Sequence, residues 1–170
     1  MSNEEYIIPL SGLSLGDHSI TYTIDDSFFA NYDYFDAITG KLNLEVEMIK
    51  ESSLIDFKFQ FTGFFELKCD CCLDKFKLNV EDNFRLIVNF GNEFEEVSDE
   101  IITIPYNESK IDLSQYIYEY INLMLPYKKV HPDDEFGNST CNQEMLDRIN
   151  TFSEQQKDPR WDALKNIKLD

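Results

Sequence analysis

Residues 57–69 read Phe-Lys-Phe-Gln-Phe-Thr-Gly-Phe-Phe-Glu-Leu-Lys-Cys, and this stretch decides the fold class. Apolar side chains stand at positions 57, 59, 61, 65, 67 and 69, and most of the positions between them are polar. Successive side chains of a β-strand point to opposite faces of a sheet, so this alternation predicts a strand with one buried face.

The same two-residue period recurs on both sides of this strand. It covers residues 18–24, 42–48 and 76–90, and the segment 51–53 (Glu-Ser-Ser) is typical of a hairpin turn. Half-buried strands joined by short turns indicate an antiparallel sheet. We therefore predict a curled antiparallel β-sheet or partial barrel from the N-terminal two thirds of the chain, because so many phenylalanines share one face.

Beyond residue 110 the apolar period changes from that of a strand to that of a helix. Apolar residues of the stretch 112–125 are spaced to form one helical face. Asp112 and Gln115 stand at the spacing of a capping box, and Pro126 ends the pattern. We predict a helix over this stretch that covers the sheet and buries Tyr120.

Two further helices are predicted nearer the C-terminus. One starts at Thr140, which stands at capping-box spacing from Gln143, and the other has Asp158 as its N-cap and Pro159 at its first position. Residues 27–36 are ambiguous and fit a short helix. Strands followed by helices, rather than alternating with them, indicate the α+β class with two to three C-terminal helices.

Length and composition fit one globular domain. The 170 residues are 42% apolar and 28% charged, and a chain of this size buries a sizeable core unaided. We therefore expect a single domain over residues 1–170, mainly β in 1–105 and mainly α in 106–170. The longest apolar stretches span only a few residues, so no membrane-crossing helix is expected. The acidic start lacks the basic and apolar regions of a signal peptide, which favours the cytoplasm.

Net charge is the strongest compositional signal. The chain carries 33 acidic and 15 basic residues, a formal net charge of −18. A field of this sign repels phosphate backbones, so no strong binding of free nucleic acid is expected. Basic proteins and metal ions are the favoured partners, although acidity can also serve solubility alone. The segment 93–100 holds five acids and no base, which indicates a solvated loop or edge, or a docking patch for a basic partner.

Four cysteines stand at positions 69, 71, 72 and 141. In a reducing compartment they suggest a metal site, a redox motif or small buried side chains. Cys69 and Cys72 form a C-x-x-C pair between two predicted strands, an arrangement typical of a zinc knuckle. A knuckle of this kind needs a second pair of ligands.

His131 and Cys141 are the candidates for that second pair. The polar, turn-rich segment between them places them ten residues apart, which is longer than standard finger spacings. Together with Cys69 and Cys72 they would form a Cys₃His set for Zn²⁺, a common structural zinc site. We expect Cys141 in the first turn of a helix, whose dipole favours the thiolate. A metal-free knuckle with small buried thiols and a surface histidine is the alternative.

Motifs for catalysis are not recognisable. A thioredoxin-like role needs C-x-x-C at the start of a helix, whereas here a strand pattern follows it. The sequence has no nucleophile elbow, phosphate-binding loop, dinucleotide fingerprint or H-E-x-x-H motif. The other histidine, His18, lies on the apolar side of a predicted strand and is expected in the core or at an edge. We expect no enzymatic activity; an RNA-processing or thiol-based enzyme is the alternative.

The knuckle and its surroundings resemble the YceD family, a family of bacterial and plastid proteins. In residues 67–76 an apolar strand is followed by Cys69 and Cys72, at the positions of the family's C-x-R-C motif, and soon afterwards by an aromatic residue. Cys71 stands where the family usually has an arginine. This departure puts in doubt any contact with RNA at this position.

Three further segments are similar to the same family. Residues 111–126 resemble its helix with the pattern I-D-L, then E, then L-x-L-P, and residues 158–164 resemble its C-terminal D-P-x-x-x-x-L box. His131 and Cys141 match a His/Cys position and a later cysteine of the family. The resemblance covers about residues 60–168.

The resemblance implies a non-enzymatic role in the accumulation, processing or stability of large-subunit ribosomal RNA. Genes of the family often neighbour that of a small basic ribosomal protein of the large subunit. We hypothesise that an acidic protein of charge −18 steers and shields such a protein before assembly. The expected partner is therefore a basic ribosomal protein or a large-subunit assembly intermediate.

Overall fold

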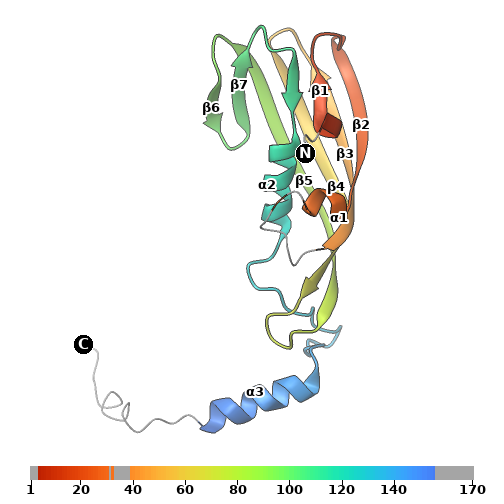
Figure 1. The fold of residues 1–170 in the computed structure, drawn as a ribbon, viewed down its shortest axis with the longest axis vertical. Helices are drawn as coiled ribbons and strands as arrows, with labels where there is room; N and C mark the ends of the chain where they lie inside the picture. The colour runs from red at the N-terminus through yellow and green to blue at the C-terminus, as the bar shows by residue number, and fades with distance from the viewer. Residues whose placement is uncertain (1–3, 31, 33–38, 156–170) are drawn as a thin grey trace, which may run out of the picture. The chain divides into compact units, whose positions relative to one another are not determined.

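A computed structural model describes residues 4–30, 32 and 39–155, which form two compact units (Figure 1). The sheet unit comprises the described residues up to Leu67 together with Lys77–Tyr127. The knuckle unit comprises Lys68–Phe76 together with the described residues from Lys128 onward. Strands and helices follow one another as expected for the α+β class, so this prediction is confirmed.

A six-stranded sheet is the centre of the sheet unit. Its strand order is β2-β3-β4-β5-β7-β6. The strands are β2 (Gly16–Ile24), β3 (Thr39–Lys50), β4 (Leu54–Lys68), β5 (Lys75–Gly91), β6 (Glu95–Ser98) and β7 (Ile101–Pro105). The pairs β2–β3, β3–β4 and β6–β7 are antiparallel, whereas β5 and β7 run parallel. The sheet is mixed, so the prediction of an antiparallel sheet is wrong at β5–β7.

The sheet is neither closed nor strongly curled, so the predicted barrel is not formed. Its order ends at β2 on one side and at β6 on the other. Phenylalanines 57, 59, 61 and 65 of β4 are fully buried, as their alternation predicts. Helices cover them: the ring of Tyr120 lies 5.1 Å from that of Phe59, and Phe29 lies 6.2 Å from Phe65. Because other elements cover this face, the sheet need not close on itself to bury it.

Two glycines allow the backbones of β3 and β4 to approach closely. A Cβ on Gly63 would lie 2.2 Å from the carbonyl oxygen of Lys41, and one on Gly40 would lie 2.4 Å from that of Phe64. Gly63 also has a φ of +152°, which side chains other than glycine rarely adopt. The break in the apolar alternation at position 63 is therefore a requirement of strand packing.

Helix α2 (Ser114–Met124) covers the sheet as predicted, and Tyr120 is buried, with 6% of its surface exposed. The chain enters α2 from a two-stranded sheet. This sheet consists of β1 (Ile7–Pro9), which follows the 3-10 turn η1 (Glu4–Tyr6), and β8 (Lys110–Asp112). The carboxylate of Asp112 accepts a hydrogen bond from the backbone N–H of Ser114 at 2.9 Å. The expected pairing of Asp112 with Gln115 is therefore not the interaction that starts the helix. Leu125, before Pro126, is already extended.

The short helix α1 (Asp26–Phe29) occupies the beginning of the ambiguous segment 27–36. The carboxylate of Asp25 caps it, because it accepts hydrogen bonds from the N–H and the hydroxyl of Ser27 at 2.9 and 2.6 Å. The rest of that segment lies outside the described residues, apart from residues 30 and 32. His18 is half-buried on the edge strand β2, as expected for an edge histidine.

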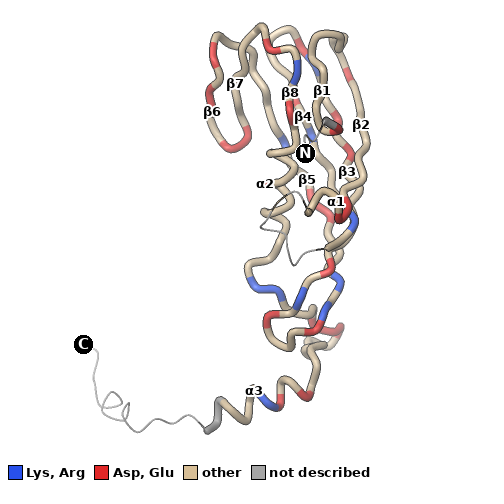
Figure 2. The backbone as a smooth tube through the Cα atoms, in the orientation of Figure 1, with Lys and Arg blue, Asp and Glu red and all other residues tan. Residues whose placement is uncertain are grey.

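The acidic segment 93–100 forms the other edge of the sheet. All four residues of β6 are exposed, and Figure 2 shows Asp and Glu along this strand and the turns beside it. The prediction of a solvated loop or edge is confirmed. Among the helices of the described ranges, none is both long and apolar enough to cross a membrane.

Helix α3 (Gln143–Gln155) belongs to the knuckle unit and starts later than predicted. The hydroxyl of Thr140 donates to the carbonyl of Pro132 at 2.6 Å instead of capping the helix. Asn142 is the cap, because its side-chain oxygen accepts a hydrogen bond from the N–H of Glu144 at 3.1 Å. Cys141 therefore precedes the helix and does not lie in its first turn. The helix predicted from Asp158 lies outside the described residues.

Candidate metal centre

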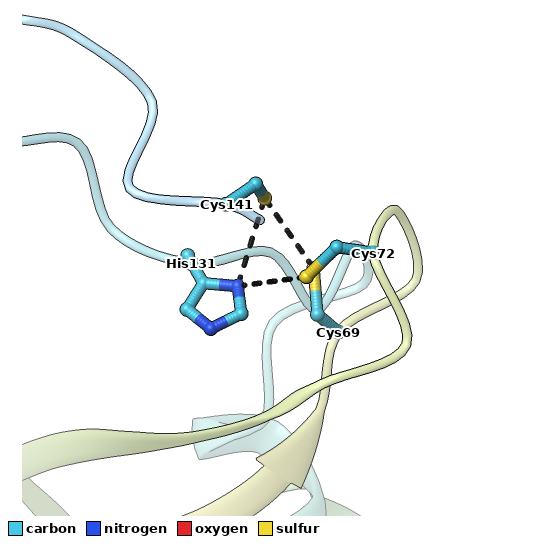
Figure 3. Close-up of side chains that lie close together, drawn as sticks. All are labelled: Cys69, Cys72, His131 and Cys141. Carbon is cyan, nitrogen blue, oxygen red and sulfur yellow. Dashed lines mark hydrogen bonds between the residues drawn. The ribbon is translucent and has the colours of Figure 1, made fainter. Parts of the chain in front are cut away.

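The first two candidate ligands lie on the turn that joins β4 to β5. The N–H of Leu73 donates to the carbonyl of Cys69 at 3.0 Å, and the N–H of Cys69 donates to the carbonyl of Asp74 at 2.9 Å. Leu73 adopts a left-handed conformation with a φ of 66°. This tight turn brings the side chains of Cys69 and Cys72 to the same side of the chain (Figure 3), as the C-x-x-C spacing predicts.

The loop 132–140 brings the other two candidates together. Its two arms form a β-bridge between Asp133 and Ser139. The carboxylate of Asp134 accepts hydrogen bonds from the backbone N–H groups of Phe136 and Asn138 at 2.9 and 2.8 Å. This closed loop explains why ten residues can separate His131 from Cys141 within one site.

Hydrogen bonds also tie the knuckle turn to the segments that carry His131 and Cys141. The N–H of Asp70 donates to the carbonyl of Lys129 at 2.6 Å, and the carboxylate of Asp70 accepts from the N–H of Lys129 at 2.7 Å. The side-chain amide of Asn142 donates to the carboxylate of Asp74 at 3.0 Å. These links hold the two halves of the site in register, and the sequence analysis did not identify them.

Four side chains converge at the centre of the knuckle unit (Figure 3). The Sγ atoms of Cys69 and Cys141 are 3.7 Å apart. The Nδ1 atom of His131 lies 3.4 Å from the Sγ of Cys72 and 3.6 Å from that of Cys141. All four potential ligand atoms lie within 4.8 Å of one another.

These distances fit tetrahedral coordination. Two thiolates bound to one tetrahedral zinc ion are separated by about 3.8 Å, and a thiolate and an imidazole nitrogen by about 3.5 Å. The four side chains could therefore bind one metal ion without a large rearrangement. Cys141, the ligand most distant in sequence, lies beside the knuckle as the sequence analysis requires.

The environment of the thiols differs from one cysteine to the next. The three cysteines among the candidate ligands are buried, and all four cysteines of the chain are free. Burial alone would raise the pKa of Cys69, but hydrogen bonds from the backbones of Cys72, Cys71 and His131 and from the His131 ring outweigh it and lower this pKa to about 6. Burial raises the pKa of Cys72. Of these two thiols, Cys69 is thus the more readily ionised before a metal binds.

Two neighbours of the four candidate ligands show how the site is bounded. The ring of Phe76 packs against the ring of His131, with a centroid distance of 4.9 Å. Cys71 lies on the same turn but is only half-buried and is not one of the four converging side chains. The site therefore contains the four residues that the sequence analysis singled out, with Cys71 beside it.

The fold and the site define the class of protein. It is an α+β protein with a knuckle unit in which three cysteines and one histidine could bind a metal. A sequence model of the family described as large ribosomal RNA subunit accumulation protein YceD matches residues 57–168. The chain belongs to the YceD family, as its motifs indicate. The family's description associates it with accumulation of the large ribosomal RNA subunit. Among curated proteins and among solved structures, no significant match to this chain was found.

Proposed function

We propose that this protein is a non-enzymatic factor that supports the accumulation of large-subunit ribosomal RNA by binding a basic ribosomal protein or an assembly intermediate. The observation that carries the proposal is the exposed acidic edge of the sheet, in a chain of net charge −18 from a ribosomal-RNA accumulation family. Long-range attraction of this kind raises the rate at which oppositely charged partners meet.

The chemistry of the knuckle supports a structural role for a metal. Four protein ligands complete the coordination of a tetrahedral ion and leave no open position for a substrate. We propose that Cys69, Cys72, His131 and Cys141 bind Zn²⁺ and that the ion stabilises the knuckle unit. Soft thiolates and an imidazole suit this ion, whereas Mg²⁺ and Ca²⁺ prefer oxygen ligands.

Affinity purification tests the proposed partner. The tagged protein should recover a basic ribosomal protein or a large-subunit intermediate at about 0.1 M salt and lose it at about 1 M, where the Debye length falls from ~10 to ~3 Å. Cells depleted of the protein should contain less large-subunit ribosomal RNA, and the wild-type gene should restore it. Recovery of no ribosomal component at low salt would contradict the proposal.

A second arm measures binding of naked ribosomal RNA. We expect weak binding, because the acidic surface repels phosphates. Lys68, Lys75, Lys128 and Lys129 of the knuckle unit are the residues to substitute if binding is seen. Tight, sequence-tolerant binding of naked RNA by the purified protein would overturn the proposal that the partner is a basic protein.

Elemental analysis of the purified protein tests the metal. We expect about one zinc per chain in the wild type, no zinc in Cys72→Ser, and unchanged zinc in Cys71→Ser, which is the matched control on the same turn. Wild-type protein without zinc, purified in the absence of chelators, would reject the four-ligand site.

A further inference from the structure

A groove runs along α2 within the sheet unit. It consists of two adjoining cavities of about 630 and 660 Å³. One lies between α2 and the β6–β7 hairpin, and the other between α2 and strands β4 and β5. Asp99, Tyr120 and Leu123 line both of them, so the two cavities form one continuous depression, here called the α2 groove.

The α2 groove combines an apolar floor with an acidic rim. Tyr116, Tyr120 and Leu123 of α2 line it, and Leu123 is 71% exposed although it is apolar. Carboxylates line its walls, namely Glu96, Asp99, Glu100 and Glu119. An exposed leucine beside tyrosine rings and surrounded by carboxylates offers a partner both apolar contact and charge.

Few basic side chains neutralise this rim. Lys58 and Arg85 are the cations that line the groove, both in the cavity beside β4 and β5. The guanidinium of Arg85 is already engaged, because it donates two hydrogen bonds of 2.8 Å to the carboxylate of Asp56. The cavity beside the β6–β7 hairpin is lined by three carboxylates and by no basic side chain.

The pKa values of Tyr116 and Tyr120 reflect the carboxylates around the groove. Burial raises the pKa of Tyr116, and the carboxylates of Glu96 and Glu119 raise it further. Burial also raises the pKa of Tyr120, with added contributions from Tyr116, Glu119 and Glu100. Carboxylates from α2, from β6 and from the turn before β7 thus act on the same space.

We infer that the α2 groove binds an extended segment of the partner protein that carries several lysines or arginines around one apolar or aromatic side chain. This inference rests on the proposed function, since it assumes a basic partner, and it assigns the surface that receives that partner. The apolar side chain would cover Leu123, and the cations would face the rim carboxylates and the tyrosine rings, which attract cations. A second copy of the chain is a poor occupant, because it brings a net charge of −18 to an acidic groove.

A pair of matched variants tests the groove. The groove variant combines Glu96→Gln, Glu119→Gln and Leu123→Ser. The control variant combines Glu45→Gln, Glu47→Gln and Ile49→Ser on β3, which removes the same charge and an exposed apolar side chain outside the groove. All six side chains lie outside the buried core, so both variants should fold, which circular dichroism checks.

The probe is a labelled 12-residue peptide of alternating lysine and arginine with one central phenylalanine, titrated by fluorescence anisotropy at about 0.1 M salt. The groove variant should bind it about tenfold more weakly than the wild type, and the control variant within about twofold of the wild type. A peptide with serine in place of phenylalanine should bind all three proteins more alike. Equal weakening by both variants, or no difference between the two peptides, would overturn the inference, because either result indicates diffuse attraction.

Affinity purification with the same two variants separates this inference from the proposed function. If the groove variant recovers the basic ribosomal partner as well as the wild type does, the groove inference fails and the proposed function stands. If the wild type recovers no ribosomal component, the proposed function fails, and the peptide titration still decides whether the groove selects basic segments with an apolar anchor.

Discussion

The sheet unit and the knuckle unit differ in what they bury. The sheet unit encloses aromatic and aliphatic side chains from β3, β4, β5 and α2, including Phe57, Phe59 and Tyr120. Among the described side chains of the knuckle unit, the buried ones are Cys69, Cys72, Phe76 and Cys141. Hydrophobic burial can stabilise the first unit, but three thiols and one ring are too little apolar surface to stabilise the second. A metal bound by those thiols would supply the missing free energy.

Metal removal should therefore have the largest effect, and it should act on one unit first. Zinc binding is worth about 10–16 kcal/mol in peptides that fold around the ion, so its loss should unfold the knuckle unit. We expect a chelator to abolish hydrogen-exchange protection of knuckle amides such as those of Asp70 and Leu73, whereas amides of β3 and β4 stay protected.

Hydrogen exchange can also be compared between Cys141→Ser and wild type, which avoids any side effect of the chelator. Cys71→Ser is the control that should behave as wild type. Knuckle amides that stay protected after the zinc has been removed would show that the unit is stable without metal. The contrast between the two units would then not hold.

A cavity in the sheet unit should have the next largest effect. Tyr120→Ala removes a ring that stacks on Phe84 at 4.5 Å and contacts Phe59 at 5.1 Å. We expect the free energy of unfolding to fall by about 3 kcal/mol, measured by urea denaturation, with unchanged zinc content. Tyr127→Ala is the control, because that side chain is fully exposed. A loss of zinc in Tyr120→Ala would show that the units do not respond separately.

Charge on the acidic edge should affect binding rates more than stability. Replacing Glu93, Glu95, Glu96, Asp99 and Glu100 with their amides should slow association with the basic partner and change dissociation less, because long-range charge acts mainly on encounter. Surface plasmon resonance at two salt concentrations measures both rates. The control neutralises five exposed carboxylates outside the acidic edge and outside the hydrogen bonds between the two halves of the metal site, namely Glu45 of β3 and Asp133, Glu135, Glu144 and Asp147 of the knuckle unit. If the edge variant binds its partner as the wild type does, the acidic edge serves only solubility.

The smallest effects should come from two exposed aspartates, one in each unit. Hydrogen bonds from Ser27 hold the pKa of Asp25 below its usual value, and hydrogen bonds from Asn138 do the same for Asp134. A lowered folded-state pKa means that each carboxylate stabilises its unit above about pH 3.9 and that this contribution is lost as the pH falls through the folded-state value.

Asp25→Ala should slightly lower the stability of the sheet unit at pH 7, and the difference from wild type should shrink toward pH 3 in urea denaturation. Asp134→Ala should instead slightly weaken metal binding at pH 7, measured by competition with a chelator, because it loosens the loop between His131 and Cys141. An effect of Asp134→Ala on the sheet unit alone would contradict the assignment of this loop to the metal site.

Much of the site could be predicted because its chemistry is local. Cys69 and Cys72 stand on a turn between two alternating strands, and few other residues of the chain could complete a thiol and imidazole set. The closure of the loop before Cys141 was harder to predict, since the ten residues from His131 to Cys141 exceed the usual spacing of zinc ligands. The signal that could have revealed it is Asp134 followed by Gly137 and Asn138, a combination typical of side-chain-capped turns.

The fold was predicted where it follows from alternation and was wrong where it depends on distant contacts. The alternation of apolar and polar residues in β3, β4 and β5 indicates which face of the sheet is buried. The parallel pairing of β5 with β7 has no local signal, because the intervening strand β6 is short and wholly exposed. The start of α3 was placed too early because the hydroxyl of Thr140 binds a distant carbonyl instead of the helix.

The order of the ligands along the chain has a consequence for the sheet unit, although none of them belongs to it. Cys72 and His131 are 59 positions apart, and the chain between them includes all of β5, both strands of the β6–β7 hairpin and α2. Zinc bound to both would close this stretch into a ring and restrict the unfolded chain, an entropic effect worth about 4 kcal/mol for a loop of this size. The sheet unit should stay folded without the ion yet melt at a lower temperature, so its thermal midpoint would report metal occupancy at a distance.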